Sequence, residues 1–181
     1  HHAVAFRALT SNQGAHAEGS YFMKTNWQKR GTIQHPHLGA WTSRLAGKIN
    51  PELPGFVSIM SGAKLAGAGF LGPEHEQLIV RDSEKGLANA TLARGDTAEA
   101  MAHRLSLAKK LNADYQTRYA SKGVQAYGAA FDATTKLMQS RDLDAFDISR
   151  ESTKRRALYG NSRFGQGCLL ARRLSSSGVR F

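Results

Sequence analysis

The sequence contains one cysteine, four prolines and no long run of apolar residues. The single cysteine, Cys168, excludes a disulfide within the chain. Its place on the apolar side of a predicted helix favours a small buried side chain over a nucleophile. A helix needs about 20 consecutive apolar residues to cross a bilayer, so the sequence also excludes a membrane span. No signal peptide is recognisable, and 41% hydrophobic residues predict a globular domain.

Acidic residues are scarce, with 14 Asp and Glu against 25 Lys and Arg, which gives a net charge of +11. This excess is compatible with solvated helix faces, with attraction to an anionic substrate or polyanion, or with a nucleic-acid surface. The sequence has no nucleic-acid motif, and its aromatic residues do not alternate with basic ones as stacking platforms would. Solvated helix faces are therefore the favoured interpretation, and nucleic acid is the least favoured partner.

Short apolar segments alternate with helical patterns in the first half of the chain. Strands are predicted at residues 3–9, 55–60 and 77–80, and helices at residues 16–27 and 36–47. The glycine-rich residues between the second and third strands predict a loop, without the Gly-Lys-Ser/Thr ending of a phosphate loop. This alternation predicts an α/β domain in which the sheet strands are flanked by long helices.

Residues 97–140 have the strongest helical periodicity in the sequence. Apolar residues recur at steps of three and four, Asp96 is the predicted N-cap, and residues 121–123 mark a break between two helices. We expect these helices to form a scaffold or to cover the sheet.

The C-terminal segment predicts a helix followed by the start of a strand. Gly160 ends the preceding helix, and Asn161 or Ser162 caps the next one, which carries Phe164, Cys168, Leu169, Ala171 and Leu174 at helical spacing. Gly178 closes this helix, and residues 179–181 begin an extended segment. Such a strand normally lies inside a parallel sheet with more chain after it. We therefore expect residues 1–181 to be an incomplete single domain.

The string YGNSRFGQGCLLARRL followed by GVRF resembles the central signature of a family of exported bacterial proteins called domain of unknown function 1501. HPHLGAW, LPGFVSI and GAGFLGPEHEQLIV occur upstream in the order that the family shows. The resemblance extends over essentially the whole chain.

The resemblance implies a sulfatase-like domain of the alkaline phosphatase superfamily, of which this chain is the N-terminal to central portion. That superfamily binds one or two divalent ions through Asp and His at strand ends, which here implies zinc, calcium or manganese in the full-length protein. The family's metal-site-like motifs of the types WDTH, EFGRTP and GRDH are not in this sequence. The remaining ligands are therefore expected outside the chain, and this portion is not expected to retain the ion. The resemblance also implies a periplasmic or exported protein.

The loop after the first predicted strand holds the candidate site residues. In phosphatases of this superfamily a Ser or Thr nucleophile precedes a Thr-Gly pair by about nine residues, at a helix start where N–H groups hold an anion. The same spacing counted back from Thr25 reaches His16, and Asn26 replaces the glycine. His16 is therefore the leading candidate, as metal ligand or as nucleophile. The alternatives are a loop cap for His16, and functional roles for Asn12 and for Ser11 or Thr10.

The other histidines favour structural roles. His35 and His37 have the H-x-H spacing of some metal sites, but they flank Pro36 at a helix entry. His75 lies between two glutamates in a turn expected to face solvent, and His103 lies off the apolar stripe of its helix. The aspartates at positions 142, 144 and 147 lack the glycine and final Glu of a calcium loop, which favours helix capping.

The sequence is compatible with two functions. The first is a metal-dependent hydrolase of phosphate or sulfate esters, inactive in this portion alone, with an anionic small molecule or polysaccharide as substrate. The second is a non-catalytic envelope or polysaccharide-binding protein that retains the fold. The sequence leaves both open, and it does not determine the oligomeric state.

Overall fold

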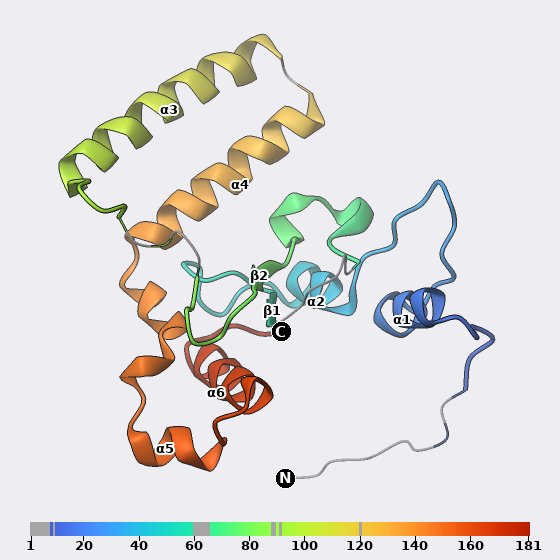
Figure 1. Cartoon of the computed structure of the whole chain (residues 1–181). Coiled ribbons are helices and arrows are strands. Elements are labelled where there is room, and N and C mark those ends of the chain that lie inside the picture. Colours follow the sequence, from blue (N-terminus) through green and yellow to red (C-terminus); the bar gives the residue numbers. More distant parts are fainter. Residues whose placement is uncertain (1–7, 9, 60–65, 88–89, 91, 120) are drawn as a thin grey trace.

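The computed structural model describes residues 8, 10–59, 66–87, 90, 92–119 and 121–181. Its helices and strands follow the predicted order (Figure 1). The α-helices are α1 (His16–Thr25), α2 (Leu38–Ala46), α3 (Ala98–Arg118), α4 (Lys122–Gln139), α5 (Thr153–Leu158) and α6 (Arg163–Ser176). The strands are β1 (Val57–Ile59) and β2 (Leu78–Val80), and short 3-10 turns lie at Gly69–Leu71, Pro73–His75, Arg141–Phe146 and Ile148–Arg150. The strand predicted at residues 3–9 lies almost entirely outside the described residues.

The sheet formed by the described residues is a parallel pair. β1 and β2 are in register from Val57 opposite Leu78 to Ile59 opposite Val80. On the N-terminal side of β1, the backbone N–H of Val57 donates to the carbonyl of Phe181 at 2.8 Å. The C-terminal residue thus lies beside the start of β1, although no strand is assigned to residues 179–181. Helices around a parallel strand pair confirm the α/β class at this coarse level.

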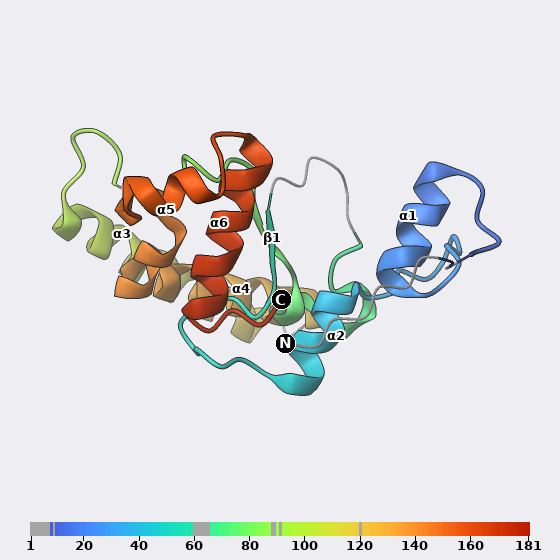
Figure 2. The same cartoon turned by 90° about the horizontal axis from the view of Figure 1, so that it is seen from below.

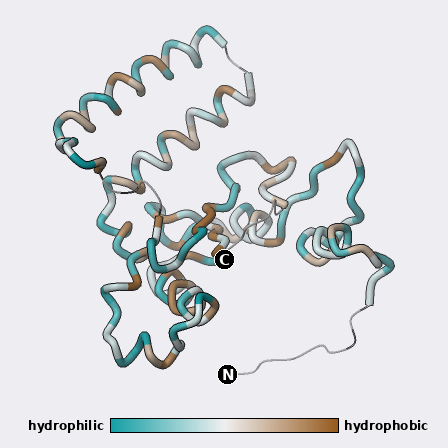
Figure 3. Tube along the Cα trace, in the orientation of Figure 1, coloured by the Kyte–Doolittle hydropathy of each residue, from teal (hydrophilic) through white to brown (hydrophobic). Residues whose placement is uncertain are grey.

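The hydrophobic core lies between α6, the two strands and the 3-10 turns that precede α5 (Figure 2). Leu169 and Leu170 on α6 are fully buried, and they pack in one cluster with Phe146, Ile148 and Val80. Full burial of each such side chain contributes about 1.5–3 kcal/mol. Hydrophobic positions accordingly gather at the strands and on α6 (Figure 3).

The two longest helices form an antiparallel hairpin that extends away from the strands (Figure 1). The predicted break between them is confirmed. Of the two roles expected for these helices, scaffold or cover over the sheet, the second does not fit α3, which packs against α4 and contains no buried residue. Asp96, the predicted N-cap of α3, is also wrong, because the N-cap is Thr97, whose side chain accepts from Ala100 N–H. Asp96 instead pairs with Arg104 at 2.7 Å.

The ends of α6 agree with those predicted from the sequence. Gly160 has a φ of +71°, and the Ser162 hydroxyl accepts from Gly165 N–H at 3.1 Å. The predicted apolar face is partly wrong, because Phe164 is 72% exposed while Gln166 is buried. The Gln166 amide donates to the carbonyl of Gly160 at 2.6 Å, which satisfies its polar group inside the core.

Across the part of the chain that the structure describes, none of the helices combines the length and apolarity needed to span a bilayer.

Candidate functional site

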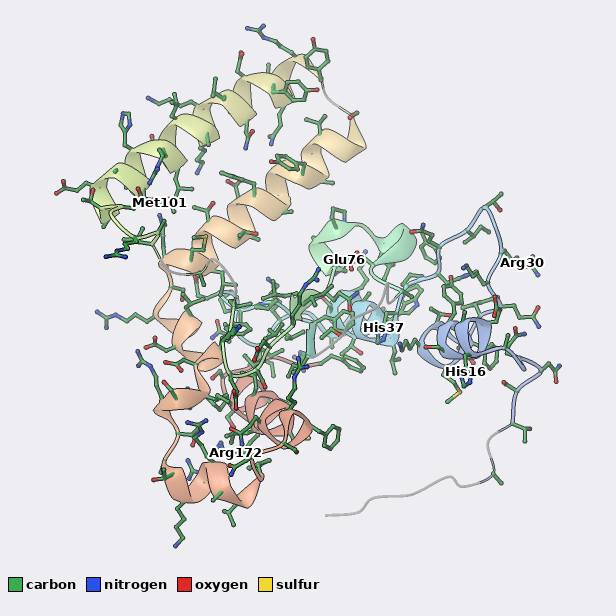
Figure 4. All side chains as sticks on the ribbon, viewed as in Figure 1. His16, Arg30, His37, Glu76, Met101 and Arg172 are labelled. Atoms are coloured by element: carbon green, nitrogen blue, oxygen red, sulfur yellow. The ribbon has the colours of Figure 1, made fainter. Side chains whose placement is uncertain are left out.

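His16 is the first residue of α1, and its side chain is exposed (Figure 4). The N-cap is Ala15, which has extended backbone angles and no side-chain oxygen to accept from the first N–H groups. The other helices of eight or more residues begin at Ser, Thr or His caps whose side chains accept a backbone N–H. The first turn of α1 therefore leaves N–H donors without a side-chain acceptor beside the His16 imidazole.

The loop before α1 is also exposed to solvent. Ser11 uses its hydroxyl to accept from Gln13 N–H at 3.4 Å, and the side chains of Thr10 and Asn12 form no hydrogen bond within the described residues. The candidates Thr10, Ser11 and Asn12 thus lie on one exposed loop that leads to His16 at the start of α1.

A complete metal centre is not formed by the described residues, which contain no group of three or more His, Cys, Asp or Glu side chains placed to hold an ion. The nearest acidic residue in sequence is Glu18, but side chains two positions apart on a helix do not share a face. His16 therefore fits one position of a ligand set, and it does not make a metal site by itself.

The far end of α1 is attached to the segment that leads into α2. The backbone N–H of His35 donates to the Tyr21 hydroxyl at 2.7 Å, and the His35 Nδ1 lies 2.9 Å from the same oxygen. Trp27 stacks on the His35 ring at 5.2 Å between centroids. Through these contacts His35 attaches α1 to the segment before α2. They favour a structural role for this histidine over metal binding.

His37 is the N-cap of α2. The helix begins at Leu38, two residues after the start predicted at Pro36. Its Nδ1 accepts from Gly39 N–H at 2.9 Å, and its ring lies 4.8 Å from that of Phe56 and 5.7 Å from that of Phe181. Burial lowers the pKa of His37, and the positive charge of Lys24 lowers it further. His37 is therefore a buried N-cap, which agrees with the structural role predicted for it.

His75 does not face solvent, contrary to the prediction. Its side chain is 15% exposed, and its Nδ1 lies 3.1 Å from the Ser43 hydroxyl, with a Glu74 carboxylate oxygen 3.9 Å from the other ring nitrogen. This order of Ser, His and carboxylate resembles a nucleophilic triad in composition. Ser43 is only 5% exposed, however, so a substrate has no access to it and the contact serves to attach the turn at His75 to α2.

The remaining candidates have structural environments. His103 is exposed and Cys168 is half-buried. Asp147 caps the turn at Ile148–Arg150, as predicted, by accepting from Ser149 N–H at 2.9 Å. The Ser149 hydrogen bonds lower the pKa of this carboxyl. These residues show no arrangement that points to catalysis.

One ionic group was missed by sequence reasoning. The carboxylate of Glu151 is bound by three arginines, Arg155, Arg172 and Arg173, of which two lie more than twenty positions further along the chain. Only Arg155, four residues away, has helical spacing that a sequence pattern could reveal. The hydrogen bonds from Arg155 and then Arg173 lower the pKa of Glu151.

Among protein-family models, the chain matches the one described as Protein of unknown function (DUF1501), over residues 2–181. The matched range includes the loop around His16, both strands and the whole of α6. Comparisons with curated proteins and with solved structures gave no significant match.

Proposed function

The chain belongs to the DUF1501 family, and from this premise we propose that it contributes to a metal-dependent hydrolase of phosphate or sulfate esters with an alkaline phosphatase-like fold. The observation that supports the proposal is the start of α1. An exposed imidazole, His16, lies there beside backbone N–H groups that no side chain caps. A helix N-terminus of this kind favours an anion, because free N–H groups and the helix dipole both point at it.

The proposal gives each part of this site a role. The N–H groups of the first turn of α1 would bind an oxygen of the phosphate or sulfate group, and the His16 imidazole would approach the same group as metal ligand or nucleophile. A divalent ion, when bound, would polarise a phosphoryl or sulfuryl oxygen. Asn12 and Ser11 lie in the exposed loop just before α1. From there their side chains would contact the substrate. The remaining metal ligands and an export signal would belong to other segments of the full-length protein.

The first test uses the full-length gene product. Metal content is measured after purification, and hydrolysis of an aryl phosphate and an aryl sulfate is then followed with and without a chelator. The proposal expects a bound divalent ion and turnover that the chelator abolishes. Protein without metal and without turnover would contradict it.

A second function, binding of an anionic polysaccharide without turnover, is favoured by a different observation. Three arginines surround one glutamate at α5 and α6, and the chain as a whole carries a net charge of +11. A polyanion would be attracted to such a surface whether or not the His16 site is catalytic.

A further inference from the structure

Glu151 is a nearly buried carboxylate shared by three arginines. Its side chain is 7% exposed, and Arg173 and Arg155 bind its two different oxygens at 2.8 and 2.9 Å, with Arg172 at 3.4 Å. Arg155 is on α5, whereas the other two arginines are on α6. Both views show these helices side by side (Figures 1 and 2), and Arg172 is labelled in Figure 4.

The three arginines are not equivalent. Arg173 is 16% exposed at its side chain, and besides Glu151 it donates to the carbonyls of Asp144 at 2.9 Å and Ala145 at 3.3 Å. Its three nitrogens are thus all engaged in holding the turn before α5 against α6. A structural role accounts for this arginine completely.

Arg155 and Arg172 have unused donors. Each makes one hydrogen bond within the described residues, to Glu151, and their side chains are 51% and 37% exposed. A guanidinium carries five N–H donors in a planar fork, so most of those on each residue remain available to a ligand. The shared carboxylate holds both groups close together at the surface.

The charge around Glu151 is not balanced. One carboxylate faces three guanidinium groups, and the nearby Asp144 and Asp147 are paired with another arginine, Arg150, at 2.7 and 3.6 Å. Residues 141–181 contain nine Lys and Arg and only four Asp and Glu. A purely structural ion pair would need one arginine, so the excess favours binding of an anion from solvent.

We propose that Arg155 and Arg172, positioned by Glu151, bind a sulfate or phosphate group. Two planar guanidinium forks held by the same carboxylate, each with unused donors, offer hydrogen bonds to the several acceptor oxygens of a tetrahedral oxyanion. The group would belong to an anionic polysaccharide or be a free inorganic anion. This site rests on the second function proposed above, for which it supplies the binding residues, and it does not involve His16.

Calorimetric titration tests the proposal with dextran sulfate, inorganic sulfate and inorganic phosphate as probes. Arg155→Gln/Arg172→Gln is compared with Lys109→Gln/Lys110→Gln, which removes the same charge from exposed positions on α3. Loss of charge-assisted hydrogen bonds is expected to weaken binding roughly tenfold or more in the arginine variant. The lysine variant is expected to stay within about threefold of the unmodified protein, since it loses only long-range attraction.

The outcomes separate the ligand sources. Arginine-dependent binding of dextran sulfate alone identifies the polysaccharide as the source, and arginine-dependent binding of the free ions identifies the inorganic anion. Equal weakening in both double variants, or none in either, would overturn the proposal, as would equally tight binding of a DNA duplex. Circular dichroism melts of each variant check folding.

His16→Ala separates this inference from the hydrolase proposal. It should leave unchanged the arginine-dependent part of the binding, which is the difference between the titrations with and without Arg155→Gln/Arg172→Gln, whether or not His16 is needed for turnover. Failure of the arginine site and failure of the hydrolase are therefore distinguishable.

Discussion

Replacement of Gly39 by alanine tests the packing of α2 against the core. A Cβ at this position would lie 2.5 and 2.6 Å from two ring atoms of Phe56 and 2.7 Å from a ring atom of Phe181. Phe56 is 2% exposed and cannot retreat, whereas Phe181 is 43% exposed and can move. Overpacking of this kind costs about 1–3 kcal/mol. Higher helix propensity returns up to about 1 kcal/mol, so the middle of this range, about 2 kcal/mol, leaves a net loss of about 1–2 kcal/mol.

A matched control lies at the equivalent position of α4. Gly123 is also the second residue of its helix, and no atom lies within 4 Å of the Cβ that would be added there. Urea denaturation is expected to show Gly39→Ala losing about 1–2 kcal/mol, and Gly123→Ala gaining a few tenths to about 1 kcal/mol. In a domain of this size the loss corresponds to a fall in Tm of about 2–8 °C. If Gly39→Ala were as stable as Gly123→Ala, the packing of α2 described above would be wrong.

Two further predictions concern stability. Because its folded-state pKa lies below the ordinary value of 6.5, neutral His37 contributes stability that is fully present above that pH and is lost as the pH falls toward the lower pKa. The free energy of unfolding should therefore fall between pH 7.5 and 5, and His37→Asn, which keeps a capping side chain, should flatten this fall; an unchanged profile would exclude His37 as its source. Leu169→Ala removes a fully buried side chain and should cost about 2–5 kcal/mol in urea denaturation, whereas the same change at Leu45, which is 79% exposed, should cost under about 0.5 kcal/mol.

Local signals predicted much of the secondary structure. The break between α3 and α4, the stop at Gly160 and the cap at Ser162 depend on a few neighbouring residues, and each was confirmed. The burial of Gln166 could not be predicted in this way. It depends on carbonyls of Arg156 and Gly160 that only the packing of α5 and α6 brings to it.

The site could be predicted only in part, because some of its contacts join residues that are far apart in the sequence. Ser43 and His75 meet across 32 positions, and Glu151 and Arg173 across 22, without any pattern that marks either pair in the sequence. His16 could be singled out because the spacing that the family resemblance implies, counted back from Thr25, lies within one short segment of the chain. Its catalytic role stays a prediction.

The most direct test of the hydrolase proposal compares two exposed histidines in the full-length protein. His16→Ala removes the residue at the start of α1, and His103→Ala removes one from the second turn of α3. Both variants are assayed for bound divalent metal and for kcat/KM on an aryl phosphate and an aryl sulfate. The proposal predicts that His16→Ala lowers kcat/KM by about 100-fold or more, as loss of a nucleophile or metal ligand does, while His103→Ala matches the unmodified protein. Equal activity in the two variants, or no turnover by the unmodified protein, would contradict it.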